Sequence, residues 1–375
     1  MKTYKIIILV ATFALCGKLL AEVPKVSNIR ASQLDNNKLV DIFYDVEDAE
    51  NDKLTIRVEI SADGGNRYNV PARTFQGAVG ANVDPGKDKK IRWNAGLDWD
   101  GEFSDKMRVR ITASDGKGLP GLEWSKEIPP GGFLMGQDGG PEGSGPSIHL
   151  NIEYPYWITK YEITNKQFTE FMNLAYAANK ILTDGRIKEF KTLPLTTQTG
   201  KSVLPLGDSK NIRWNINKFE VVKNPEHAVI VNFTGAKSFA EFYGYDLPTE
   251  IEWEKAARGP EFDDGGEHQV YSWGNEDQAS YYSGDKPVGW FNGINTAKDV
   301  VNGYGIYDLS GNDEWTNSLF KTLDNYGKKV IKPNLTKEYF LNNKYYVMKG
   351  YRTLYHRQSM YSTTVAGAFR LVRRD

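Results

Sequence analysis

The chain has 375 residues, enough for two domains that each bury a core. Its 47 basic side chains nearly balance 48 acidic ones, so the net charge of -1 gives no electrostatic reason to expect a nucleic-acid partner. Aromatic residues make up 13% of the sequence and 36 residues are glycine, which favours a loop-rich fold with aromatic packing over a helical bundle.

Residues 1–21 have the pattern of an export signal. Two lysines precede an apolar run at 6–15, which is too short to span a bilayer as a mature helix. The only cysteine, Cys16, is either an incidental residue of a signal cleaved after Ala21 or a lipid-attachment site, as in bacterial lipoproteins; its position favours lipidation. Leu15 departs from the small residue that most lipoprotein signals carry there. We expect an exported protein of the cell envelope or outer surface, with the N-terminal lipid as its membrane contact.

Residues 22–127 have the pattern of a small β-sandwich. Apolar and polar residues alternate at 40–46, 54–60 and 107–113, so one face of each strand should meet a core and the other water. Short strands separated by turn sequences such as DPGK and SDGKG predict an immunoglobulin-like sandwich, which we interpret as a spacer. One turn carries three acids that fit either a calcium site or, as we favour, an ordinary solvated turn: Asp48, Glu50 and Asp52.

Residues 128–375 form a second predicted domain, in which helices appear. The Pro- and Gly-rich stretch EIPPGGF marks its start. Thr164 and Thr249 each stand three residues before a Gln or Glu, which is the signature of a capping box at the start of a helix. Apolar residues at helical spacing predict another helix at 233–243. The polar, unpatterned stretch 179–222 is predicted to be a surface insertion.

Five sequence blocks between His149 and Arg374 resemble formylglycine-generating-enzyme-type (sulfatase-modifying factor) domains. They are HLNIEYPYWITKYEITNKQFTEFM, VNFTGAKSFAEFYGYDLPTEIEWEKAARG, YSWGN, NGYGIYDLSGNDEW and AFRLVRR, in the order in which that family has them. The resemblance implies an α+β, C-type-lectin-like fold for nearly the whole second domain, with a small twisted antiparallel sheet and packed helices.

The cysteine chemistry of that family is missing from this chain. The family's enzymes oxidise a substrate cysteine with two cysteines of their own, and the matching segment KGYRTLYHRQSM has Tyr355 and Met360 at those positions. Neither a phenol nor a thioether replaces a thiolate, so formylglycine generation is excluded and no catalytic residue is expected. Other members hold iron with histidines, but the four histidines here do not pair at ligand spacing. The resemblance also implies a structural calcium ion, with Asn312 and Glu314 as candidate ligands; no other metal or cofactor is expected.

The C-terminal segment is the predicted binding site. Residues 351–364 include three tyrosines, two arginines and five serines or threonines, but no Asp, Glu, Lys or Cys, a composition typical of protein-recognition surfaces. An ordinary polar hairpin is the alternative, but the segment occupies the family's active-site position, which favours binding. The predicted ligand-binding residues, within a variable stretch at about 350–368, are Tyr351, Arg352, Thr353, Leu354, Tyr355, His356, Arg357, Ser359, Tyr361, Ser362, Thr363 and Thr364.

The same segment also resembles the variable proteins of diversity-generating retroelements, including the treponemal variable proteins. Those proteins present a diversified segment on this lectin-like fold, and randomised adenines convert their Asn codons to residues such as Tyr, His, Ser and Thr. The segment here holds several residues of that set and no Asn. Gln358 and Met360 cannot arise in that way, so we expect them to be fixed.

This second resemblance implies a non-catalytic, surface-displayed protein that binds an unknown extracellular ligand, expected to be a protein and not nucleic acid. Two alternatives remain open at this point. One is a metal-dependent enzyme of the same fold with altered chemistry, and the other is a structural envelope protein without a specific ligand.

Overall fold

The computed structural model describes residues 24–34, 38–65, 68, 70–102, 104–115, 119, 121–139, 144–186, 211–260, 270–296, 298–320, 330–331, 345–361 and 365–374. The predicted export signal and Cys16 lie outside these residues. Within them, no helix combines the length and the apolar character that crossing a membrane requires.

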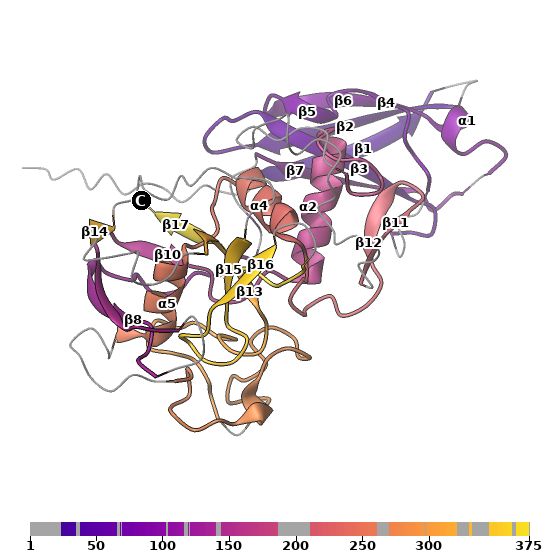
Figure 1. The fold of residues 1–375 in the computed structure, drawn as a ribbon. Coiled ribbons are helices and arrows are strands. Elements are labelled where there is room, and N and C mark those ends of the chain that lie inside the picture. The colour runs from indigo at the N-terminus through magenta and orange to yellow at the C-terminus, as the bar shows by residue number, and fades with distance from the viewer. Residues whose placement is uncertain are drawn as a thin grey trace, which may run out of the picture.

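The N-terminal part consists of two antiparallel sheets that share one core (Figure 1). The first contains, in spatial order, β1 (Lys25–Gln33), β2 (Leu39–Glu47), β6 (Gly86–Asn94) and β4 (Phe75–Gly77), and the second contains β5 (Gly80–Val83), β3 (Leu54–Ser61) and β7 (Arg108–Ser114). Tyr44, Ile56 and Trp93 come from three different strands and are buried between the sheets. The alternating pattern therefore directs one face of these strands inward, as predicted. A short helix, α1 (Ala95–Asp98), follows β6.

The C-terminal part combines helices with small sheets, which confirms the predicted α+β class. Its described helices are α2 (Asn165–Ala177), α4 (Phe233–Phe242), α5 (Glu250–Arg258) and the 3-10 helix η2 (Ala279–Tyr281). Its described strands are β8 (Gly131–Met135), β9 (Ile148–Ile152), β10 (Tyr156–Ile158), β11 (Ile212–Asn215), β12 (Lys218–Val221), β13 (Glu314–Leu319), β14 (Val330–Ile331), β15 (Tyr345–Lys349), β16 (Gln358–Tyr361) and β17 (Val372–Arg374). They pair in the orders β14-β9-β8, β10-β17, β11-β12 and β13-β15-β16.

Both predicted capping boxes are present. The Gln167 N–H donates to the Thr164 hydroxyl at 3.2 Å, and the Gln167 side chain accepts from the Thr164 N–H at 3.0 Å. Thr249 and Glu252 make the same two bonds at the start of α5, at 3.2 and 2.8 Å. Each box satisfies backbone donors that a helix start would otherwise leave without a partner.

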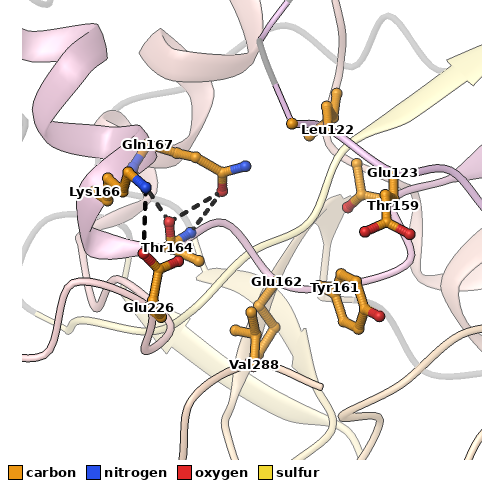
Figure 2. Close-up of a pocket in the computed structure, with 11 residues that line it drawn as sticks. Leu122, Glu123, Thr159, Tyr161, Glu162, Thr164, Lys166, Gln167, Glu226 and Val288 are labelled. Atoms are coloured by element: carbon orange, nitrogen blue, oxygen red, sulfur yellow. Dashed lines mark hydrogen bonds and ion pairs between the residues drawn. The ribbon is translucent and has the colours of Figure 1, made fainter. Parts of the chain in front are cut away.

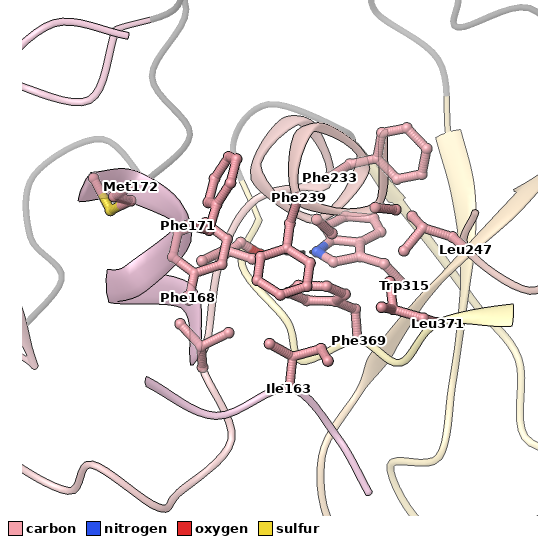
Figure 3. Close-up of a cluster of buried hydrophobic side chains, with 14 of the residues drawn as sticks. Ile163, Phe168, Phe171, Met172, Phe233, Phe239, Leu247, Trp315, Phe369 and Leu371 are labelled. Atoms are coloured by element: carbon pink, nitrogen blue, oxygen red, sulfur yellow. Dashed lines mark hydrogen bonds between the residues drawn. The ribbon is translucent and has the colours of Figure 1, made fainter. Parts of the chain in front are cut away.

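An aromatic cluster forms the main core of the C-terminal part (Figure 3). Phe168 of α2 stacks on Phe239 of α4 with ring centroids 5.7 Å apart. Phe369, from the last stretch of the chain, packs edge-on against both rings. Residues separated by some 200 positions thus meet in one core, and this fixes the stretch around Phe369 against the two helices.

The predicted surface insertion contains a packed hairpin, so that prediction is wrong for its described C-terminal end. Ile212 of β11 and Phe219 of β12 are buried against α2. The Asn173 side chain bonds both the N–H and the carbonyl of Phe219, at 2.7 and 3.0 Å. The remainder of this stretch, 187–210, lies outside the described residues.

The two parts of the chain are in direct contact. β3 is buried on both faces, because its outward residues Arg57 and Glu59 lie against α2 and the β11–β12 hairpin. At the tip of that hairpin the Asn217 side-chain amide donates to the Val70 carbonyl at 2.9 Å, and Arg73 donates to the Ile216 carbonyl. The N-terminal sheets therefore do more than act as a spacer: they are docked on the C-terminal part.

Candidate ligand-binding surface

The predicted binding segment begins directly after β15 and contains β16. Tyr351, Arg352 and Ser359 are exposed, Tyr351 with 43% of its surface, and His356 is half-buried. These four residues, which we call the exposed set, are the predicted contact residues that solvent reaches among those whose side chains the structure describes.

Three consecutive predicted contact residues, Thr353, Leu354 and Tyr355, are buried. Leu354 has no exposed surface and packs in the core cluster that contains Trp253. Its N–H donates to the Val270 carbonyl at 2.8 Å, which fixes the backbone at this point. Tyr355 is 7% exposed and Thr353 is 8% exposed. Three of the predicted ligand-binding residues, Thr353, Leu354 and Tyr355, are therefore turned away from solvent, because the chain runs inward after Arg352.

Arg357 is also buried and has a structural partner. Its guanidinium binds the carboxylate of Glu250 in bidentate geometry, at 2.6 and 2.9 Å, and both side chains have no exposed surface. The same guanidinium lies 5.0 Å from the centre of the Phe320 ring. A planar donor fork that is already engaged on a carboxylate has few donors left for a ligand, so Arg357 belongs to the framework.

The end of the segment is described only in part. Tyr361 closes β16 and pairs through its backbone with Tyr345, but its side chain lies outside the described residues, as do Ser362, Thr363 and Thr364. Tyr345 itself is 57% exposed. It adds an exposed aromatic residue that sequence reasoning missed, because it precedes the predicted segment. The continuous run of strand-forming residues at 345–348, flanked by a lysine on each side, was the signal that could have placed it on a strand.

Ion pairs from α5 flank the segment along the chain, at Lys349 before it and at Arg374 after it. Glu254 accepts a hydrogen bond from Lys349 at 2.7 Å, one residue before Gly350, and neither side chain is exposed. Glu252 binds Arg374 through two bonds of 2.6 Å. Gly350 has a φ of +95°, and a Cβ there would lie 2.8 Å from a backbone carbonyl oxygen, so glycine is required where the chain leaves the sheet. The path of the segment is thus set by the framework and not by its exposed side chains.

Three members of the exposed set, Tyr351, Arg352 and His356, lie close together. The Tyr351 and His356 rings have centroids 6.0 Å apart, and the Arg352 guanidinium lies 5.6 Å from the centre of the Tyr351 ring. His356 is 3.0 Å from the Gln358 amide. Burial, together with the nearby positive charges of Lys349 and Arg352, lowers the pKa of His356. His356 is therefore neutral at pH 7 and acts as a hydrogen-bonding group, whereas Arg352 supplies positive charge.

The positions that match the family's thiols carry no reactive group. Tyr355 is buried, and Met360 is half-buried and packs on the aromatic core. The histidines do not assemble into a metal site in the described part of the chain, where the one close group of three potential ligands is Asp48, Glu50 and Asp52. That acidic cluster lies in the N-terminal sheets, where the Asp48 carboxylate caps its own turn by accepting the Asp52 N–H at 2.7 Å.

The implied calcium ligands have other partners. Glu314 accepts Arg370 on both oxygens, at 2.6 and 2.8 Å, and also accepts the Trp253 indole N–H at 2.9 Å. The Asn312 amide donates to Glu162 at 3.1 Å. A calcium ion at these residues would have to share the Glu314 carboxylate with a guanidinium, and like charges repel. The arrangement of Asn312 and Glu314 does not fit this ion.

A pocket of about 280 Å³ opens beside the start of α2 (Figure 2). Glu162 is 98% buried at its edge, and burial together with the charge of Glu314 raises its pKa well above the ordinary value. Its lining holds three acids and one base: Glu226 and Lys166 pair with each other at 3.4 Å, Glu123 pairs with Lys160 at 3.2 Å, and Glu162 accepts the Asn312 amide.

Comparison with known proteins identifies the family to which this chain is similar. The family model of the sulfatase-modifying factor enzyme 1-like domain matches residues 125–371. The inactive C-alpha-formylglycine-generating enzyme 2 of Bos taurus is 32% identical over 229 residues, which span 53% of this chain and 71% of the relative. The formylglycine-generating enzyme of Thermomonospora curvata is 29% identical over 219 residues, which span 50% and 69%.

Among solved structures, PvdO from Pseudomonas aeruginosa is similar with a TM-score of 0.42 and 18% identity, covering 66% of this chain and 93% of that one. The family model alone spans most of the chain, from the connection after the N-terminal sheets to the residue before β17. The chain therefore belongs to the sulfatase-modifying factor enzyme 1-like domain family.

Proposed function

We propose that this chain is a non-catalytic binding protein whose lectin-like C-terminal domain presents the exposed set to an extracellular ligand. The observation that carries the proposal is the division of the segment into a buried framework and exposed side chains. Lys349, Leu354 and Arg357 are held inside the domain, whereas Tyr351 and Arg352 reach solvent. The similarity to a relative that is named inactive agrees with a loss of catalysis.

Such an arrangement suits recognition of a protein. Tyr351 offers a large ring with few rotatable bonds, and Arg352 beside it offers planar donors, the two residue types that anchor many protein interfaces. Gly350 and the ion pairs fix the backbone before a ligand arrives, so less conformational entropy is lost on binding. Affinity would then come from a few aromatic and guanidinium contacts, with Ser359 and His356 supplying hydrogen bonds.

We further propose that the segment is diversified, as in the variable proteins of diversity-generating retroelements. In that scheme, the N-terminal sheets form an immunoglobulin-like sandwich and the chain is exported to the cell surface, with lipid attached at Cys16. Burial supports variation at some positions more than at others: a replaced side chain at 351, 352 or 359 should cost little stability, whereas one at 354 or 357 should disrupt the core.

Comparison of this locus between strains tests the proposal. We expect amino-acid differences at Tyr351, Arg352, His356 and Ser359, constancy at Lys349 and Gly350, and a neighbouring repeat with a reverse transcriptase gene. Uniform conservation of the exposed set would argue against diversification, and differences spread evenly over exposed and buried positions would argue against the division that the structure makes.

Metal analysis of the purified full-length protein tests the competing function, a metal-dependent enzyme of altered chemistry. We expect no redox metal in stoichiometric amount. One equivalent of iron or copper that survives dialysis against a chelator would replace our proposal with that one.

A further inference from the structure

A second cavity lies between the two parts of the chain, away from the exposed set. It has a volume of about 410 Å³. Its walls come from β3, from residues 72–80, from the C-terminal end of α2 and from the tip of the β11–β12 hairpin. Small-molecule sites are frequent at domain boundaries, and this volume is within their usual range.

One carboxylate at this cavity is shared by three cationic side chains. Glu59 is 4% exposed; its Oε1 is 2.8 Å from Arg57 and 3.3 Å from Lys218, and its Oε2 is 2.6 Å from Arg110. Burial by itself would raise the pKa of Glu59, but these three cations lower it. A second acid, Glu170, also pairs with Arg57, at 3.4 Å. Arg57 and Lys218 are the largely buried cations of this group, whereas the side chain of Arg110 is 49% exposed.

Arg73 adds a further positive charge to the wall. Its guanidinium donates to the Ile216 carbonyl, which is a neutral acceptor. Asp98 lies close by, but its carboxylate accepts the backbone N–H of Arg73 at 2.6 Å and the indole N–H of Trp93 at 2.8 Å. Among the described residues that line the cavity, the cations are Arg57, Arg73 and Lys218, and the acid is Glu59. Arg73 is exposed and its guanidinium has a neutral partner, so a ligand anion can reach it, and Lys218 shares its acid with two arginines.

The other walls of the cavity are apolar. Phe75 and Val79 contribute from the N-terminal sheets, and Tyr176 contributes from the end of α2, where its ring also packs edge-on against Trp214. An inorganic ion would leave these walls in contact with water alone. A ligand with one anionic group and a compact apolar body would match both the cations and the rings.

We propose that this cavity binds a small organic anion, with a carboxylate held by Lys218 and Arg73 and an apolar body placed between Phe75 and Tyr176. The proposal does not depend on the function assigned to the exposed set. Because both parts of the chain line the cavity, the bound ligand would also hold them together, and ligand binding would raise the melting temperature of the full-length protein.

Ligand-observed NMR on the full-length protein, with thermal unfolding in parallel, tests this inference. The probes are benzoate, its neutral analogue benzyl alcohol, and inorganic phosphate, each at about 10 mM, where millimolar affinities are detectable. We expect benzoate to bind and to raise the melting temperature, and the other two to bind at least about tenfold more weakly, because each lacks one of the two matched features.

Two variants locate the site. Lys218→Met leaves Glu59 with both arginines, and Arg73→Met removes an exposed guanidinium, so we expect both to fold and each to weaken benzoate binding about tenfold. Lys166→Met is the matched control on the surface and should bind benzoate as the parent does. Binding of benzyl alcohol or phosphate equal to that of benzoate, unchanged benzoate affinity in both variants, or no benzoate binding would each overturn the inference.

Discussion

The two arginines of the binding segment should respond differently to the same substitution. Arg357→Met removes two charge-assisted hydrogen bonds, of 2.6 and 2.9 Å, and leaves Glu250 as a carboxylate with no exposed surface. Removing one partner of a buried ion pair costs about 3–5 kcal/mol of unfolding free energy. Lys349 interacts electrostatically with Glu250 and offsets part of this loss, so we expect the lower end of that range, about 3 kcal/mol.

Arg352→Met is the matched control, because the same side chain there is exposed and lies over the Tyr351 ring. We expect its unfolding free energy to change by less than about 0.5 kcal/mol. Urea titration followed by near-UV circular dichroism measures both variants. A Glu250→Leu, Arg357→Met double variant should recover much of the loss, since an apolar pair of similar volume often replaces a buried ion pair. Equal stability of the two single variants would refute the assignment of Arg357 to the framework.

Three further predictions concern the same domain. Leu354→Ala should lower the unfolding free energy by about 2–5 kcal/mol, whereas Tyr351→Ala should change it little; equal losses in urea titration would contradict the burial described. Burial would raise the pKa of Glu254, but Lys349 and Arg258 lower it to about 2. The folded protein should therefore lose about 3 kcal/mol of stability as pH falls from about 4.5 to 2. Glu254→Gln should flatten this pH dependence. Thr164→Ala should cost about 1 kcal/mol of the same free energy by removing a capping box. An unchanged unfolding free energy would show that the capping box does not stabilise α2.

Local features of the fold were predictable from the sequence. Thr164 and Thr249 cap their helices with partners three residues away, and the alternation in β2 and β3 directs apolar side chains inward. The β11–β12 hairpin was missed, although the apolar residues Trp214 and Phe219 lie opposite each other on its two strands, on either side of a tight turn. Its strands have four residues each, and the turn places Ile216 at a φ of +54°, which few residues of that type adopt.

The division of the binding segment was beyond local reasoning. Arginine is a residue type typical of binding surfaces, so Arg357 was predicted to contact a ligand. Only its partner Glu250, 107 positions earlier, makes it a framework residue. Leu354 is likewise buried by residues from α5 and from the neighbourhood of Val270. Composition identified the region where the exposed set lies, but long-range pairing decides which of its side chains solvent can reach.

The central claim is that a rigid framework tolerates any side chain at the exposed set and lets those side chains bind a ligand. Two matched libraries test this claim most directly. One library randomises Tyr351, Arg352, His356 and Ser359, and the other randomises Leu354, Tyr355 and Arg357; protease resistance of displayed clones measures folding. We predict that most clones of the first library fold and that some can be selected to bind a purified test protein, whereas most clones of the second are cleaved. Equal folding in the two libraries, or a first library that folds but never yields a binder, would contradict the account.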